Sequence, residues 1–285
     1  MPDDAAEPAV TCLCPTYGRF ERLRDALACW LLQTYPHRRL IVLNDAEDDH
    51  LTLGTEVPGV TVWNVRPRCA TLGHKRQMLL RAAHTPLVAH WDDDDLYLPG
   101  HLSRCVAERR ERLLAGEPCG CIKPRRAWWA VGPPAGFAVR GPRANTFEGQ
   151  MVFDRARALE HGGYPPMVSG QARALLRRFG KAGELYKPAR QPQALTYVYR
   201  WGDGVGHISA AGNNARSHEQ HAARNGDWSR ERPIIDADDP IAWARDRIHG
   251  QLCNLVRGAR PHLDGRAAYA AMARRTLAPW IGGET

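Results

Sequence analysis

Short apolar runs alternate with helical patterns through the first 115 residues, and this alternation constrains the fold more than any other feature of the sequence. Apolar runs typical of buried β-strands cover residues 9–14, 40–43, 60–65 and 86–91. Between them, apolar residues recur at helical spacing over 20–31 and 73–83. Strands that alternate with helices form a mostly parallel sheet with helices on both faces. We therefore predict an α/β fold with a Rossmann-like central sheet flanked by helices.

The second half of the chain is less regular. Short strand-like or helical pieces are expected at 119–153, 154–161, 171–182 and 195–201, followed by a polar loop at 212–232. Helical spacing returns near 240–257 and 264–278. A chain of 285 residues accommodates one large α/β domain and a small appendage. We assign the last two stretches to a small helical C-terminal appendage.

Composition gives no sign of a membrane-spanning or disulfide-stabilised protein. No apolar run approaches the roughly 18 to 20 residues that cross a bilayer. The amino terminus, Met-Pro-Asp-Asp, is acidic and lacks an apolar stretch, so it is unlike a secretory signal. Eight cysteines without a Cys-x-x-Cys pair are expected to be reduced. We therefore predict a cytoplasmic protein without a transmembrane segment. Its net charge of +8 favours anionic partners such as nucleotide diphosphates, anionic membrane surfaces or nucleic acid.

Four consecutive aspartates, Asp92 to Asp95, directly follow the apolar run 86–91. Two carboxylates about 4 Å apart repel by roughly 4 kcal/mol at an effective dielectric near 20. A divalent cation offsets that repulsion, and Mg²⁺ or Mn²⁺ commonly binds one or two carboxylates together with substrate phosphates. The alternative is a solvated acidic loop or helix start. Because ligands of parallel sheets bind at the carboxyl ends of strands, where residues 15–17 and Asp45 are also expected, we predict one site built from three segments.

Three segments resemble a known family: residues 10–23, 40–49 and 72–102, which read VTCLCPTYGRFERL, LIVLNDAEDD and LGHKRQMLLRAAHTPLVAHWDDDDLYLPGHL. Together they resemble the family-2 glycosyltransferases of the GT-A fold, which have a metal-dependent Asp-x-Asp motif. The resemblance implies transfer of a sugar from a nucleotide-sugar donor, with UDP as the expected nucleotide, to an acceptor hydroxyl. It also implies a nucleotide-sugar-binding half at 1–115, an acceptor-binding half of the same domain at 116–211, and a polar loop with a helical extension at 212–285.

The resemblance also implies roles for individual residues. Nucleotide-sugar binding is implied for Pro15, Thr16, Tyr17, Arg19, Asp45, Gly73, Lys75, Asp92 and Asp93. Metal binding is implied for Asp94, with Asp95 in support, and for His207 after a glycine-rich loop. Mn²⁺ or Mg²⁺ is the expected cofactor. Without the resemblance, Tyr17 could equally pack in the core and Lys75 could equally be a solvated helix start.

The sequence departs from the family at the catalytic base. Inverting members use an Asp or Glu to deprotonate the acceptor hydroxyl, in a segment that follows a Gly-Gly-Tyr turn such as 162–164. Here that segment contains Gln171 and Ala172, and neither side chain takes a proton. Glu148 and Asp203 are the remaining candidate bases. Chemistry other than simple inversion is an alternative, and so is a non-catalytic protein that binds a nucleotide sugar or nucleic acid through a degenerate active site.

The sequence leaves the acceptor open. Trp128, Trp129 and Gln171 are expected to contact it. Basic residues interleaved with tryptophan over 123–129 suit phosphate contacts and base stacking. One hypothesis is therefore that the acceptor is a hydroxymethylated base in DNA, flipped out of the duplex, as for the DNA-modifying glycosyltransferases that phages encode. A glycan, a lipid-linked sugar or a small metabolite is the other, with the tryptophan pair as core or as a sugar platform. A nucleotidyltransferase is disfavoured, because residues 15–19 lack its Gly-rich phosphate loop.

Overall fold

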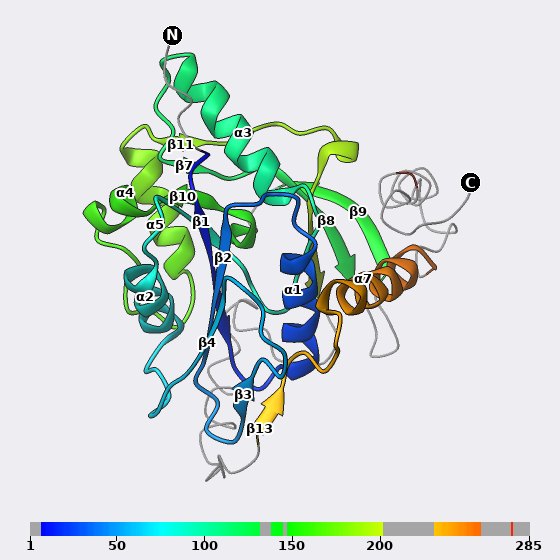
Figure 1. Ribbon diagram of the computed structural model, residues 1–285. Helices are drawn as coiled ribbons and strands as arrows, with labels where there is room; N and C mark the ends of the chain where they lie inside the picture. The colour runs from blue at the N-terminus through cyan, green and yellow to red at the C-terminus, as the bar shows by residue number, and fades with distance from the viewer. Residues whose placement is uncertain (1–6, 132–137, 145–146, 202–230, 258–274, 276–285) are drawn as a thin grey trace.

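The computed structural model describes residues 7–131, 138–144, 147–201, 231–257 and 275. A seven-stranded sheet forms its centre, in the order β11-β7-β10-β5-β1-β2-β4 (Figure 1). Its strands are β1 (Val10–Thr16), β2 (Arg38–Asn44), β4 (Val60–Asn64), β5 (Leu87–His90), β7 (Cys121–Ile122), β10 (Val152–Asp154) and β11 (Leu185–Tyr186). Strands β5, β1, β2 and β4 are parallel, whereas β10 is antiparallel to both neighbours. The predicted mostly parallel sheet is confirmed.

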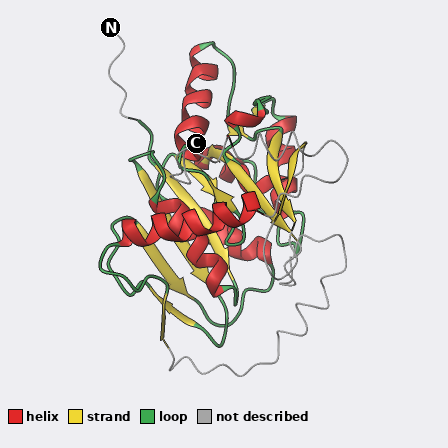
Figure 2. Ribbon diagram, turned by 90° about the vertical axis from the view of Figure 1, so that its right-hand side faces the viewer, coloured by secondary structure: helices red, strands yellow, loops and turns green. Residues whose placement is uncertain are grey.

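Helices cover both faces of this sheet (Figures 1 and 2). They are α1 (Phe20–Leu31), α2 (Leu72–Ala82), α3 (His101–Leu114), α4 (Arg155–Glu160) and α5 (Gln171–Lys181). The side chains of β1 alternate between two apolar clusters: Val10 and Cys12 pack in the cluster that includes α1 and α3, and Leu13 packs in the cluster that includes α2 and α5. This is the two-residue period of a strand that is buried on both faces.

A second sheet of four strands lies beside the aspartates. In the order β6-β12-β8-β9, its strands are β6 (Leu96–Tyr97), β12 (Tyr197–Trp201), β8 (Arg126–Val131) and β9 (Ala138–Ala144). β6 begins directly after Asp95, and β12 pairs with it so that Tyr197 lies opposite Tyr97. The smaller elements are η1 (Glu148–Gln150), η2 (Pro192–Ala194), and β3 (His50–Thr52) paired with β13 (Glu231–Pro233).

The helix α7 (Pro240–Arg257) packs against α1. Arg247 Nε donates to Asp25 of α1 at 2.7 Å, and Arg200 Nη1 of β12 donates to the other oxygen of Asp25 at 2.8 Å. Because Asp25 is buried, these two arginines neutralise a charge that would be costly alone. The predicted helix near 240–257 is therefore α7, and the one near 264–278 lies almost wholly outside the described residues.

The described part of the chain contains no helix that is long and apolar enough to cross a bilayer. All eight cysteines lie within it as free thiols, and six of them are buried. Burial raises the pKa of the Cys105 thiol, as expected for a packing residue rather than a reactive one.

Candidate active site

The carboxyl ends of β1 and β5 meet at a cavity of about 370 Å³. The two strands are parallel, with Leu13 opposite His90, so the loop after β1 and the aspartates after β5 leave the sheet side by side. The cavity is lined by Pro15, Thr16, Tyr17, Arg19, Leu72, Lys75, Arg76, Asp92, Asp94, Asp95, Phe147, Glu148, Gly149, Ser169, Gly170, Gln171, Ala172, Arg173, Tyr197 and Tyr199. Its volume is within the range of small-molecule sites.

The four aspartates alternate in direction. The side chains of Asp92 and Asp94 are 20% and 14% exposed and line the cavity. Asp93 and Asp95 are buried, at 0% and 1% residue exposure. The turn after β5 therefore presents an Asp-x-Asp pair, Asp92 and Asp94, to the cavity.

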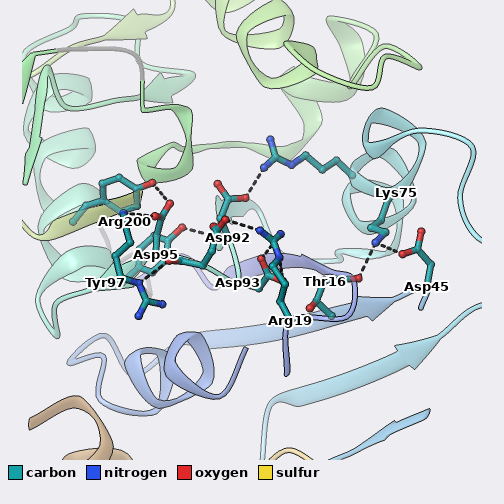
Figure 3. Close-up of polar contacts among 12 residues, drawn as sticks. Thr16, Arg19, Asp45, Lys75, Asp92, Asp93, Asp95, Tyr97 and Arg200 are labelled. Carbon is teal, nitrogen blue, oxygen red and sulfur yellow. Dashed lines mark hydrogen bonds and ion pairs between the residues drawn. The ribbon is translucent and has the colours of Figure 1, made fainter. Parts of the chain in front are cut away.

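Each of these carboxylates also has a partner on the protein (Figure 3). Asp92 pairs with Arg76. Asp93 and Asp94 share Arg19, whose Nη2 and Nη1 lie 2.6 Å from their respective oxygens. Two arginines thus offset part of the repulsion that, from the sequence, suggested a metal ion.

Asp95 links the aspartate block to the second sheet. One oxygen accepts a hydrogen bond from the backbone N–H of Arg200 at 2.9 Å, and the other accepts one from the hydroxyl of Tyr197. Burial raises the pKa of Asp95 well above its usual range, and Asp94 and Asp92 raise it further. The position of Asp95 suits an anchor between two sheets better than a metal ligand, and its support of a metal stays a prediction.

The donor set fits a divalent cation at Asp94. Mg²⁺ or Mn²⁺ needs only one or two carboxylates when substrate phosphates supply the other oxygens, and Asp94 and Asp92 are two carboxylates that face one cavity. Among the described residues no group of three or more His, Cys, Asp or Glu side chains could hold a metal alone. His207 and Asp203 lie outside the described residues.

On the β1 side of the cavity, Lys75 ties two segments together. Its Nζ donates to the carbonyl oxygen of Thr16 at 2.8 Å and pairs with Asp45. Asp45 also accepts from the backbone N–H of Cys69 at 3.0 Å, is buried and does not line the cavity. Lys75 is therefore a buried ion-pair residue rather than a solvated helix start. The contact of Asp45 with a nucleotide stays a prediction.

Tyr17 and Gly73 are placed differently from one another. Tyr17 lines the cavity, and the guanidinium of Arg68 lies 3.8 Å from its ring centroid. Gly73 does not line the cavity. A Cβ added at Gly73 would overlap the carbonyl oxygen of Pro165 and lie 2.8 Å from the backbone nitrogen of Met167. Packing of α2 against that turn already requires glycine, whatever its relation to a nucleotide.

Two of the residues expected to handle the acceptor, Glu148 and Gln171, also line the cavity. Glu148 lines the cavity and accepts from Arg173 Nε at 3.1 Å. A Cβ on Gly149 would lie 2.7 Å from Asp92 Oδ2, so the turn that carries Glu148 lies directly against the aspartates. Gln171 also lines the cavity.

Trp128 and Trp129 do not line the cavity. Trp128 is buried among apolar residues of the core, which is the alternative that the sequence left open, and Trp129 is half-buried. These positions do not support an acceptor-binding role for either tryptophan.

Sequence reasoning missed Arg76, Phe147, Arg173, Tyr197 and Tyr199 as lining residues. Phe147 and Tyr199 stack with ring centroids 4.5 Å apart, a contact between distant segments that no local pattern reveals. Arg76 carried a weak signal, because it is a charged residue on a helix whose neighbours Leu79 and Leu80 face the core.

Comparison with known proteins agrees with this geometry. The model of the family described as glycosyl transferase family 2 matches residues 11–129. The match covers 119 of the 285 residues. The resemblance stated from the sequence is therefore confirmed for the part of the chain that holds β1, β5 and the aspartates.

Solved structures of S. aureus TarS residues 1–349 share the fold of this chain. The complex with UDP-GlcNAc has a TM-score of 0.51 and 12% identity, and the match covers 96% of this chain and 71% of the TarS 1–349 chain. The complex with UDP has a TM-score of 0.50 and 11% identity, and the match covers 96% of this chain and 70% of the TarS 1–349 chain. At these identities the likeness supports the GT-A fold alone. No curated protein matches the chain significantly in sequence.

The substitution Asp95→Asn should lower the free energy of unfolding by about 1–3 kcal/mol, because an amide turns one acceptor oxygen into a donor that faces Tyr197 or Arg200. Asp94→Asn should change it by less than about 1 kcal/mol, since Arg19 keeps its contact with Asp93. Urea unfolding of the two variants measures the difference. Equal destabilisation by both would contradict an anchoring role for Asp95.

Proposed function

We propose that the protein is a metal-dependent glycosyltransferase that moves a sugar from a nucleotide-sugar donor to an acceptor hydroxyl. The observation that carries this proposal is the Asp-x-Asp pair, Asp92 and Asp94, which faces a cavity at the carboxyl ends of β1 and β5. The match of residues 11–129 to the model of glycosyl transferase family 2 supports it.

The donor half of the reaction uses the β1 side of the cavity. Pro15, Thr16 and Tyr17 would line the base and ribose, and Arg19 would lie near the diphosphate. UDP is the first nucleotide to test, because the TarS structures with the same fold are complexes with UDP and UDP-GlcNAc. Asp94, with Asp92, would hold Mn²⁺ or Mg²⁺. Such a cation offsets the charge that grows on the leaving diphosphate.

Glu148 is the proposed general base. It lines the same cavity as Asp94, on a turn that contacts Asp92. A general base must come within hydrogen-bond distance of the acceptor hydroxyl, so a candidate base is judged first by its position in the cavity. Gln171 occupies the wall where the family pattern expects a carboxylate, and it would orient the acceptor rather than deprotonate it. Asp203 remains the alternative base.

The acceptor side suits a ligand with a flat or apolar face and negative charge. The stacked Phe147 and Tyr199 supply an aromatic surface, and Arg173 is 52% exposed at the cavity. Arg177 and Lys181 are exposed further along the same helix. A hydroxymethylated base in DNA and a charged glycan or metabolite both fit this description. A non-catalytic binder of nucleotide sugars or nucleic acid is the second candidate, favoured by the Gln171-Ala172 pair.

Incubation with a panel of nucleotide sugars and MnCl₂ tests the proposed function. We expect release of free nucleotide from at least one donor, and added hexose mass when the panel includes the right acceptor, with hydroxymethylated DNA as one arm. Asp94→Ala should abolish both signals, whereas Glu111→Ala removes an exposed carboxylate of α3 that lies outside the cavity, and serves as the control. If no donor binds or turns over with Mn²⁺ or Mg²⁺, the proposal is wrong, and donor binding without turnover favours the non-catalytic candidate.

Glu148→Gln should reduce turnover by about 10²–10⁴-fold, the usual contribution of a general base, while the Kd for the donor stays within twofold of wild type. Single-turnover kinetics with saturating donor measures the chemical step, and equilibrium titration measures donor affinity. Asp203→Asn and Glu160→Gln are the comparison variants. Loss of turnover in Asp203→Asn with full activity in Glu148→Gln would assign the base to Asp203 instead.

A further inference from the structure

Arg19 holds two neighbouring aspartates at once (Figure 3). Its Nη2 lies 2.6 Å from Asp93 Oδ1 and its Nε donates to Asp93 Oδ2 at 3.2 Å. Its Nη1 lies 2.6 Å from Asp94 Oδ2. A guanidinium is therefore bound to Asp94, the carboxylate to which the proposed function assigns the metal.

The two halves of this contact differ in how firmly they are held. The Asp93 half has two bonds in fork geometry, which is the stronger arrangement for arginine and a carboxylate, and Asp93 is also hydrogen-bonded by Thr16. Its side chain is 1% exposed. The Asp94 half is a single contact at the cavity wall, where Arg19 and Asp94 are both accessible. The Asp93 bonds can therefore persist while the Asp94 contact breaks.

We propose that Arg19 is the resident counter-ion of Asp94, that it leaves Asp94 when a divalent cation binds there, and that the freed Nη1 then donates to the diphosphate of the donor. This rests on the proposed function, because it takes Asp94 as the metal ligand. A guanidinium and a divalent cation repel each other and compete for the same carboxylate oxygen. A diphosphate brings acceptor oxygens for both cations, so the exchange is favourable only when nucleotide is present.

The consequence is that the divalent cation binds well only when nucleotide is present. Without nucleotide, Arg19 satisfies Asp94 and the divalent cation binds weakly. With nucleotide, the diphosphate takes over the Nη1 hydrogen bond, and the Oδ2 atom of Asp94 that Arg19 held becomes available. Arg76 does not serve the same purpose, because it pairs with Asp92. Arg19 is thus a positioning residue that couples metal binding to donor binding.

The substitution Arg19→Gln separates this role from that of a simple phosphate ligand. Titration with MnCl₂ in the absence of nucleotide, followed by the EPR signal of free Mn²⁺, should show affinity raised on the order of tenfold, a typical size for coupling between two ligands. Calorimetric titration with UDP, and with GDP in parallel, at saturating Mn²⁺ should show nucleotide affinity lowered by a similar factor. Removing one positive charge therefore strengthens the binding of one partner and weakens that of the other.

Two further variants control the experiment. Arg173→Gln removes an arginine that lines the same cavity but pairs with Glu148, so its Mn²⁺ affinity should stay within twofold of wild type. Arg19→Lys keeps the charge but loses the fork that binds Asp93 and Asp94 together, so its Mn²⁺ affinity should lie between those of wild type and Arg19→Gln. It also gives a result if Arg19→Gln does not fold, as judged by circular dichroism.

Unchanged Mn²⁺ affinity in both Arg19 variants, with Mn²⁺ still bound by wild type, overturns this inference and leaves the proposed function standing. Raised Mn²⁺ affinity with unchanged nucleotide affinity overturns the diphosphate half of the inference. An equal rise of the Mn²⁺ affinity in Arg173→Gln also overturns the inference, because loss of any positive charge at the cavity would then explain the effect. Failure of every form to bind Mn²⁺, with or without UDP or GDP, overturns the metal site of the proposed function and this inference with it.

Discussion

Four consecutive carboxylates at the end of a buried strand must each be compensated, and much of the structure around the cavity follows from that requirement. Adjacent charges of like sign repel strongly where they are partly buried, because the effective dielectric constant is lower there than in water. The compensating groups come from three separate segments: Arg19 after β1, Arg76 on α2, and Tyr197 with Arg200 on β12. The aspartate block therefore joins the central sheet, a covering helix and the second sheet at one point.

The same requirement extends to the carboxyl-terminal helix. Arg200 donates to the backbone oxygen of Asp94 at 2.7 Å and to Asp25 at 2.8 Å, and Asp25 in turn accepts from Arg247 of α7. Buried charges of this kind are costly when one partner is lost. They form a continuous chain of contacts from α7 to the loop that carries the proposed metal ligand, so α7 supports the site without lining the cavity.

The central sheet was predictable from the sequence because β1, β2 and β5 are buried on both faces and read as continuous apolar runs. The convergence of residues 15–17 and the aspartates on one cavity was predictable too, since parallel strands end at the same edge. The second sheet was not, because β6 has only two residues and its partner β12 is distant in the chain. Long-range pairing of short strands has no local signature.

Side-chain roles were harder to predict than positions. From the sequence, the aspartates were predicted to need a metal ion to relieve their repulsion, whereas the structure shows that arginines relieve part of it. Asp45 was expected to touch a nucleotide, yet Lys75 and Cys69 already occupy its oxygens. Trp128 suggested an acceptor surface, yet it packs in the core. In each case the partner lies far away in sequence, so residue type alone could not identify the role.

The most direct test of the central claim is a crystal structure of the protein with UDP and MnCl₂, recorded at the manganese absorption edge. We expect an anomalous peak that marks a Mn²⁺ ion coordinated by Asp94 and by diphosphate oxygens, with the uracil beside Tyr17. Nucleotide bound outside this cavity, or manganese bound away from Asp94, would contradict it.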